Sequence, residues 1–160
     1  MNDLMNKQYK KRRFSAILQK RIDAGLFEFP DGTLFQYMPI SAYRMIERSI
    51  DDFSEVSIED FRSHAERGIV PKNRGSKKKQ GSVEYVNRPD YYGVSVFTSK
   101  EEMINRLHLP RENRKIAQGM VCCEGGPILP SQEDSHICWW IYDGYHIHTF
   151  KIQNEEETNE

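Results

Sequence analysis

The stretch Ser135-His-Ile-Cys-Trp-Trp-Ile-Tyr-Asp-Gly-Tyr-His-Ile-His-Thr-Phe-Lys-Ile152 says most about the fold, because two runs rich in aromatic and β-branched residues flank Asp143-Gly144. Asp-Gly tolerates the positive φ angles of a type I′ turn, so the stretch predicts a β-hairpin with a two-residue loop. Alternation along its strands would place His146 and His148 on one face and His136 on the other.

Two interpretations of these histidines stay open. A histidine on a strand with apolar neighbours more often bonds a backbone group than takes part in chemistry. The alternative for His146 and His148 is a shared role as acid, base or ligand. His136 follows Asp134 at the start of the first predicted strand, where we expect it to be more exposed and within reach of that carboxylate.

The size and charge of the chain bound its class. With 160 residues and a net charge of −1, it fits a single domain, which we place at 1–152, followed by a disordered acidic tail at 153–160. No apolar run approaches the roughly 18 residues that cross a bilayer, and the basic N-terminal segment lacks the apolar stretch of a secretory signal. We therefore predict a cytoplasmic protein without membrane contact, and we leave its oligomeric state open.

The cysteines do not predict a disulfide framework or a metal site. There are three, two of them adjacent at Cys122-Cys123, and no Cys-x-x-Cys spacing occurs. Reduced, buried thiols are the expectation. We predict no metal and no tightly bound cofactor.

The remaining periodicity predicts an α+β domain. Helices are expected mainly in the N-terminal half, and a largely antiparallel sheet ends in the C-terminal hairpin. The predicted helices cover 14–25, 41–46, 57–67 and 99–108. The predicted strands comprise a hairpin at 26–38, short strands at 83–86, 92–97 and 116–123, and the terminal hairpin, with a loop at 128–134.

Positive charge gathers in a Gly- and Ser-containing loop near 71–82, which we expect to be flexible. Cations beside aromatic side chains can hold a nucleic-acid strand by charge neutralisation and stacking. The first functional hypothesis is therefore a binding or accessory protein for an acidic partner, either nucleic acid or protein; a solvated loop without a ligand is the alternative. The candidate binding residues are Lys72, Arg74, Lys77, Lys78, Lys79, Arg88, Tyr91 and Tyr92.

A second hypothesis comes from Arg44, the segment Ser95-Val-Phe-Thr-Ser99 and Glu133. Their order resembles the arginine, serine-threonine-serine and glutamate motifs of small ADP-ribosyltransferases, although the serine motif is less compact here. The resemblance covers these short sites alone and implies that Arg44 holds a phosphate of a nicotinamide dinucleotide and Glu133 its ribose. The alternative function is therefore a small transferase or hydrolase, with Arg44, Ser95, Glu133 and His136 as candidate catalytic residues.

Overall fold

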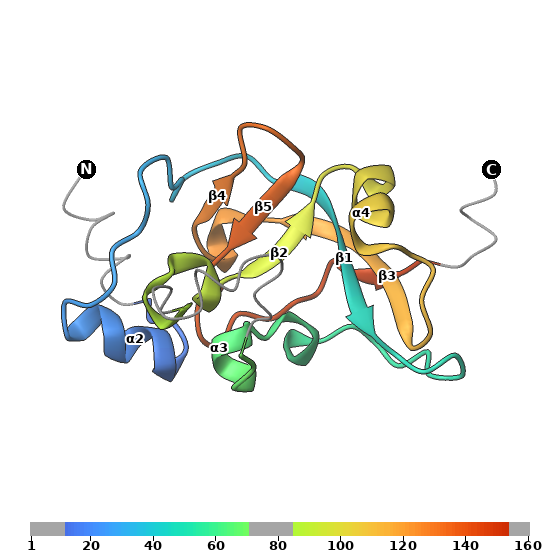
Figure 1. The fold of residues 1–160 in the computed structure, drawn as a ribbon, viewed down its shortest axis with the longest axis horizontal. Helices are drawn as coiled ribbons and strands as arrows, with labels where there is room; N and C mark the ends of the chain where they lie inside the picture. The colour runs from blue at the N-terminus through green and yellow to red at the C-terminus, as the bar shows by residue number, and fades with distance from the viewer. Residues whose placement is uncertain (1–11, 71–84, 154–160) are drawn as a thin grey trace, which may run out of the picture.

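The computed structural model describes residues 12–70 and 85–153. Its centre is one antiparallel sheet in the order β4-β5-β2-β1-β3-β6 (Figure 1). The prediction of an α+β fold with an antiparallel sheet is confirmed. The strands are β1 (Ile40–Glu47), β2 (Val94–Phe97), β3 (Arg114–Val121), β4 (Ile128–Pro130), β5 (His136–Trp139) and β6 (Lys151–Ile152).

Short helices flank this sheet, with α2 and α3 below it and α4 beside β1 and β2 in Figure 1. Two α-helices confirm the predicted signals. α2 ends before Gly25 at φ 72°, and Ser99 caps α4 by accepting a hydrogen bond from the Glu102 backbone N–H. The α-helices are α2 (Ala16–Asp23), α3 (His64–Arg67) and α4 (Lys100–Leu107), and 3₁₀-helices cover Ile58–Phe61, Tyr85–Asn87, Pro89–Tyr92 and Cys123–Gly125.

The helix predicted for 41–46 is wrong, because this segment is the central part of β1. Ala42 and Ile46 are both buried. Residues four apart share a face in a helix and also in a strand, so their spacing fits either structure. The segment is a strand because β3 pairs with β1 along all of Ile40–Glu47.

The helix predicted for 57–67 is two helices. Ser57 and Ser63 each form a complete capping box, the first with Asp60 and the second with Glu66. The chain turns extended at Arg62 between the two helices, and α3 ends at Gly68 with φ 66°. This break directs α3 toward the sheet and brings His64 to the candidate site.

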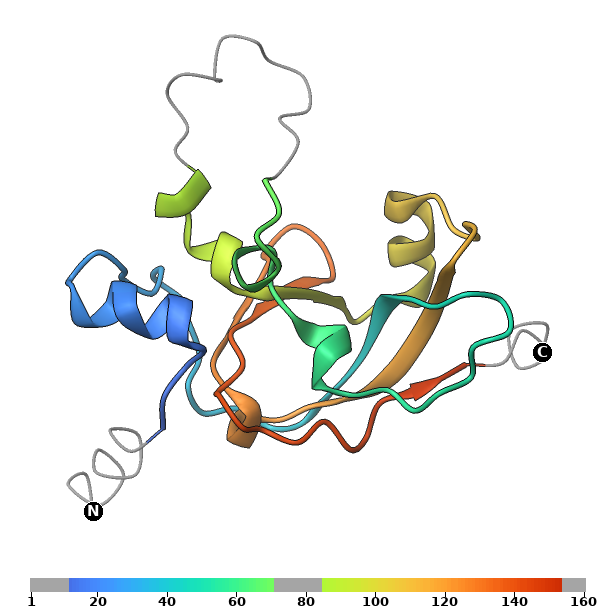
Figure 2. The ribbon, with the colours of Figure 1, turned by 90° about the horizontal axis from the view of Figure 1, so that it is seen from below.

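The C-terminal hairpin is wrong in its pairing, although its turn is present. Gly144 has φ 80°, and the Tyr145 backbone N–H bonds to the Tyr142 carbonyl. However, β5 pairs with β2 and β4, and β6 pairs with β3 at the other edge of the sheet. Because β5 has a partner on each side, the segment after the turn crosses the sheet to β6 (Figure 2).

Three smaller predictions also fail. The segment 26–38 contains no strand, and Leu34 instead forms an isolated bridge to Ile128. The segment 128–134, expected to be a loop, begins with β4. The short strand expected at 83–86 is also wrong, because Tyr85 and Val86 lie in a 3₁₀-helix. The acidic tail placed at 153–160 stays a prediction; of its residues the structure describes Gln153, whose backbone N–H bonds to the Ile116 carbonyl oxygen. Residues 154–160 lie outside the described part of the chain.

Alternation along β5 divides the core between the two faces of the sheet. Ile137 and Trp139 pack in one cluster with Phe61 and Phe150. Cys138 packs in a second cluster that contains Trp140 and Leu18. The described residues contain no helix of the length and apolarity that a membrane crossing needs.

Candidate functional site

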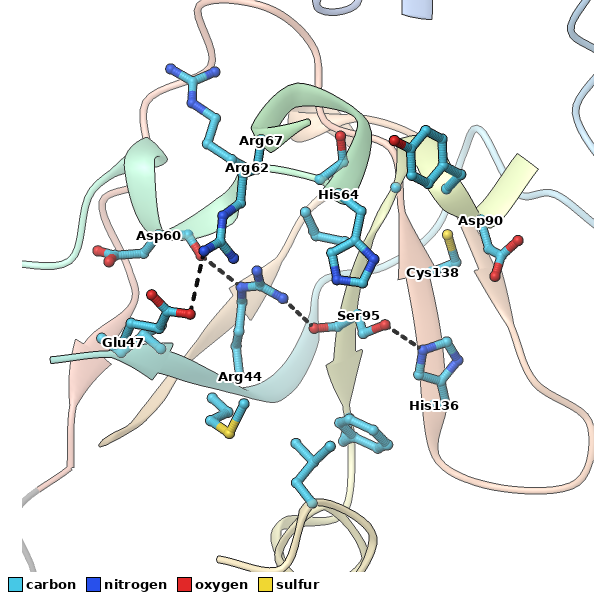
Figure 3. Close-up of a pocket in the computed structure, with 18 of the residues that line it drawn as sticks. Arg44, Glu47, Asp60, Arg62, His64, Arg67, Asp90, Ser95, His136 and Cys138 are labelled. Atoms are coloured by element: carbon cyan, nitrogen blue, oxygen red, sulfur yellow. Dashed lines mark hydrogen bonds and ion pairs between the residues drawn. The ribbon is translucent and has the colours of Figure 1, made fainter. Parts of the chain in front are cut away.

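A groove of about 860 Å³ opens on the sheet between β1, β2 and β5 on one side and α3 on the other (Figure 3). We call it the arginine groove. Arginines from six positions line it, together with four carboxylates, so cations are in excess among its lining groups. The arginines are Arg44, Arg62, Arg67, Arg88, Arg106 and Arg111, and the carboxylates are Glu47, Glu59, Asp60 and Asp90.

Arg44 enters the groove where β1 and β2 separate. Tyr43 and Phe97 are the single registered pair between these strands, whereas β1 and β3 pair over eight residues. Beyond this pair a side chain bridges the strands, because Arg44 Nη1 donates to the Ser95 carbonyl oxygen at 2.8 Å. Figure 3 shows the guanidinium between Ser95 and Asp60.

Two further contacts fix the Arg44 guanidinium. Nε donates to the Asp60 carbonyl oxygen at 2.8 Å, and the group lies over the Phe61 ring at 5.1 Å. Burial lowers the pKa of Arg44 to about 10, and Asp60 opposes this shift. The guanidinium therefore stays positively charged near neutral pH. Its Nη2 has no hydrogen-bond partner within the described residues, so this donor is available to a ligand.

The carboxylate of Asp60 does not neutralise Arg44, because other donors occupy it. Arg48 binds both of its oxygens, with Nη2 at 2.7 Å from Oδ2, and the Ser57 backbone N–H donates to Oδ2 at 2.9 Å. The Asp60 side chain is 7% exposed. Asp60 thus anchors the Ile58–Phe61 turn to β1 and leaves Arg44 as a cation on the groove wall.

Ser95 and His136 meet on the groove side of the sheet. The Oγ of Ser95 lies 2.8 Å from Nε2 of His136. Phe97, which pairs with His136 in the register of β2 and β5, holds the imidazole by an edge contact at 5.3 Å between ring centroids. Burial, followed by the charge of Arg106, lowers the pKa of His136. The neutral imidazole is therefore favoured.

His64 at the start of α3 is a second imidazole in the groove, and Figure 3 shows it above Ser95. Its pKa is also lowered, first by burial and then by the positive charges of Arg67 and Arg44. Two neutral imidazoles therefore lie close to a fixed cation. This is a site in which a bound anion would meet both charge and hydrogen-bonding groups.

Most rim arginines are engaged with carboxylates. Arg67 pairs with Glu47 at 3.3 Å, and Arg88 with Asp90 at 3.2 Å. Arg62 is held by Glu59 and Glu66, and Arg106 by Asp134. Arg111 is exposed and forms no ion pair with any residue that the structure describes.

Of the residues that the sequence suggested for catalysis, Arg44, Ser95 and His136 come together in the groove. Glu133 does not line it. That residue lies exposed in the loop before β5, where its backbone N–H donates to Ser131 Oγ at 3.2 Å. The geometry therefore unites three members of the set and leaves its carboxylate elsewhere.

The candidate binding residues are divided in a similar way. Arg88 and Tyr91 line the groove, whereas Tyr92 is buried in the core with 5% exposure and cannot present its ring to a ligand. Lys72, Arg74, Lys77, Lys78 and Lys79 lie outside the described residues.

The other two histidine candidates lie away from the groove. His146 and His148 are exposed in the segment before β6, with their rings stacked at 6.1 Å between centroids. His148 Nδ1 lies 3.1 Å from the His146 carbonyl oxygen, which occupies one ring nitrogen with the backbone. Across 12–70 and 85–153, no three His, Cys, Asp or Glu side chains form a group that could hold a metal ion.

The sequence interpretation missed His64 and Arg106. Ser63-His64-Ala65-Glu66 has the spacing of a capping box, and this signal would have separated α3 from the preceding turn and exposed His64. Arg106 lies in the helix predicted for 99–108, and no local pattern indicates a functional role for it. Its Nη1 donates to Asp134 Oδ2 at 2.8 Å, a contact between residues far apart in the sequence. Its place near His136 depends on the pairing of β2 with β5.

Comparison of the chain with protein-family models, curated proteins and solved structures finds no match.

Proposed function

We propose that this protein binds a phosphate-bearing nucleotide in the arginine groove. The observation that carries the proposal is Arg44, which is charged, fixed by two backbone carbonyls and left with one open guanidinium nitrogen. A guanidinium matches phosphate oxygens in both charge and geometry. Because Arg44 is already held in place, little side-chain entropy is lost when it binds an anion.

The rim supports the same ligand class. In the pair Arg88–Asp90 both side chains are more than half exposed. Exposed ion pairs of this kind contribute little stability, about 0 to 1 kcal/mol, so the arginine can exchange its partner for a phosphate at small cost. Arg111 has no competing carboxylate among the described residues and adds a second available cation.

Aromatic side chains next to these cations suit a base. Tyr91 lies at the groove with its hydroxyl bound to the Ile69 carbonyl oxygen at 3.1 Å, which fixes the ring. Tyr85 contacts that ring at 5.0 Å between centroids. Stacking of a base on an aromatic ring contributes about 1 to 3 kcal/mol. A groove lined by both arginines and tyrosines offers groups for the phosphate and for the base of a nucleotide.

Isothermal titration with ADP tests the proposal. Wild-type protein is expected to bind with an affinity that falls as salt is raised, and Arg111→Gln to bind about fivefold more weakly, the effect of about 1 kcal/mol. Arg44→Lys keeps the positive charge but loses the paired N–H donors of the guanidinium. It is expected to weaken ADP binding tenfold or more. Circular dichroism confirms that each variant is folded.

Arg13→Gln is the matched control. Arg13 is an exposed arginine paired with Asp23 at 3.2 Å and does not line the groove. Its substitution is expected to leave ADP binding unchanged. Equal losses for Arg13→Gln and Arg111→Gln would show unspecific attraction, and absence of ADP binding by the wild type would refute the proposal.

A second candidate function is a transferase that uses a nicotinamide dinucleotide. The convergence of Arg44 with Ser95, which the resemblance to ADP-ribosyltransferases implied, favours it. His136, and not Glu133, lies in the groove beside Ser95. Release of nicotinamide from NAD, lost in Arg44→Lys and retained in Glu133→Gln, would support this function. No release by the wild-type chain would exclude it.

A further inference from the structure

We propose that Ser95 is a nucleophile, with His136 as its base, that cleaves carboxylic esters of anionic ligands bound in the arginine groove. The recognition of an anionic substrate rests on the proposed function. The reactivity of Ser95 toward small reagents does not depend on it.

The first support is the geometry of the two side chains. A separation of 2.8 Å between Oγ and Nε2 is the hydrogen-bond distance that transfer of the hydroxyl proton requires. Ser95 is exposed in the groove, so its Oγ is accessible to a ligand, whereas Val94 and Val96 on the same strand are buried. The hydroxyl therefore lies at the surface of a rigid, paired strand.

The environment of His136 suits a base. A base must be unprotonated at working pH, and the lowered pKa of the imidazole keeps it neutral at pH 7. The charged groups facing it are Arg106, which opposes protonation, and Asp134, Asp90 and Glu102, which favour it. Nδ1 has no hydrogen-bond partner in the described part of the chain, so the dyad lacks an orienting carboxylate and a low rate is expected.

Arg44 is the cation that contacts Ser95. Its Nη1 fixes the carbonyl of Ser95 at 2.8 Å, which holds the guanidinium beside the backbone of the nucleophile. A preorganised donor near the attacked carbonyl stabilises the oxyanion that develops there. The open Nη2 of Arg44 is the group assigned to this task.

The reaction balances with water as the co-reactant. The Oγ of Ser95 forms a bond to the acyl carbon, its proton passes to Nε2 of His136, and the ester C–O bond breaks. The protonated imidazole gives that proton to the leaving alkoxide. Water then attacks the acyl carbon, loses a proton to His136 and releases the carboxylic acid, with the proton returning to Oγ.

A fluorophosphonate reagent tests the nucleophile without a known substrate. Attack by Oγ forms an O–P bond and expels fluoride, and peptide mass spectrometry locates the adduct. Wild-type protein is expected to carry the adduct at Ser95 and not at Ser41, an exposed serine that binds Gln118 at 2.9 Å outside the groove. His136→Gln is expected to slow labelling by about 100-fold or more.

The pH dependence of labelling is a second measurement, and it uses the wild-type protein, so it does not depend on whether His136→Gln folds. The rate of wild-type labelling is expected to fall in acid, below the ordinary imidazole value of 6.5, as His136 becomes protonated. An unlabelled Ser95, or a rate equal to that of Ser41 and independent of pH, would overturn the proposal. ADP titration of the same preparation separates the two claims, since intact binding with an inert Ser95 leaves the proposed function standing.

Discussion

The Oγ of Ser95 and the Nε2 of His136 lie 2.8 Å apart although 41 positions separate them in the sequence. The pairing of β2 with β5 produces this contact, because Phe97 is opposite His136 and Ser95, two residues before Phe97 on β2, lies on the same face. Disturbing the register of these strands would therefore separate the two side chains.

The groove histidines are expected to make stability depend on pH. His64 and His136 both have pKa values below the ordinary 6.5 in the folded chain, for which burial is the main cause. Just below pH 6.5 the unfolded chain therefore binds more protons, and the free energy of unfolding falls as the pH is lowered. Urea unfolding between about pH 7 and pH 5 is expected to show this loss. A smaller slope is expected in His136→Gln; an unchanged slope would contradict the burial argument.

Asp60→Asn is expected to destabilise the fold strongly. The Asp60 and Arg48 side chains are 7% and 11% exposed, so the substitution removes the closer counter-charge of a nearly buried guanidinium and leaves it with Asp52 at 3.9 Å. The expected loss is about 3 kcal/mol in the free energy of unfolding, measured by urea titration. Glu59→Gln on the same turn is the control, because Glu59 is 73% exposed and its removal should change little. Equal effects of the two substitutions would refute the role assigned to Asp60.

Gly126→Ala is expected to prevent stable folding. Gly126 has φ 138°, and a Cβ at this position would overlap the carbonyl oxygen of Trp140. We expect a loss of at least about 4 kcal/mol. Gly25→Ala provides the comparison, since Gly25 also has positive φ but no atom within 4 Å of the added Cβ. Its cost should be limited to backbone strain, about 1 kcal/mol; thermal unfolding distinguishes the two.

The cysteines are expected to differ in reactivity. Cys138 is 6% exposed, and burial, followed by the charge of Asp90, raises its pKa, so its thiolate is scarce in the folded state. Cys122 and Cys123 are half-buried. Timed alkylation read by mass spectrometry should modify these two first and Cys138 only on unfolding. Early modification of Cys138 would show that the groove side of β5 is open.

Sequence patterns such as helix caps correctly predicted the elements whose ends are determined by neighbouring residues. Ser99 and Gly25 mark helix ends by their own capping chemistry, and both were correct. β1 was mistaken for a helix because Ala42 and Ile46 fit either period. The turn at Asp143-Gly144 is local and present. One edge of β5 pairs with β2, however, whose Ser95 lies 41 positions before His136, so the actual pairing of β5 could not be derived from the local sequence.

The candidate site shows the same division. Arg44, Ser95 and His136 were selected by residue type and order, and the structure brings them into one groove. Glu133 was selected by the same reasoning, but the loop before β5 directs it away from the groove. His64 and Arg106 join the site through the packing of α3 and α4 against the sheet, which no local pattern specifies.

Histidine NMR tests the central claim most directly, because the imidazoles sample different parts of the molecule. His64, His108 and His136 line the arginine groove, whereas His146 and His148 lie outside it. On titration with ADP, we expect the ring resonances of His64 and His136 to shift with a common affinity while those of His146 and His148 stay constant. Shifts confined to His146 and His148, or no shift at any histidine, would contradict nucleotide binding in the groove.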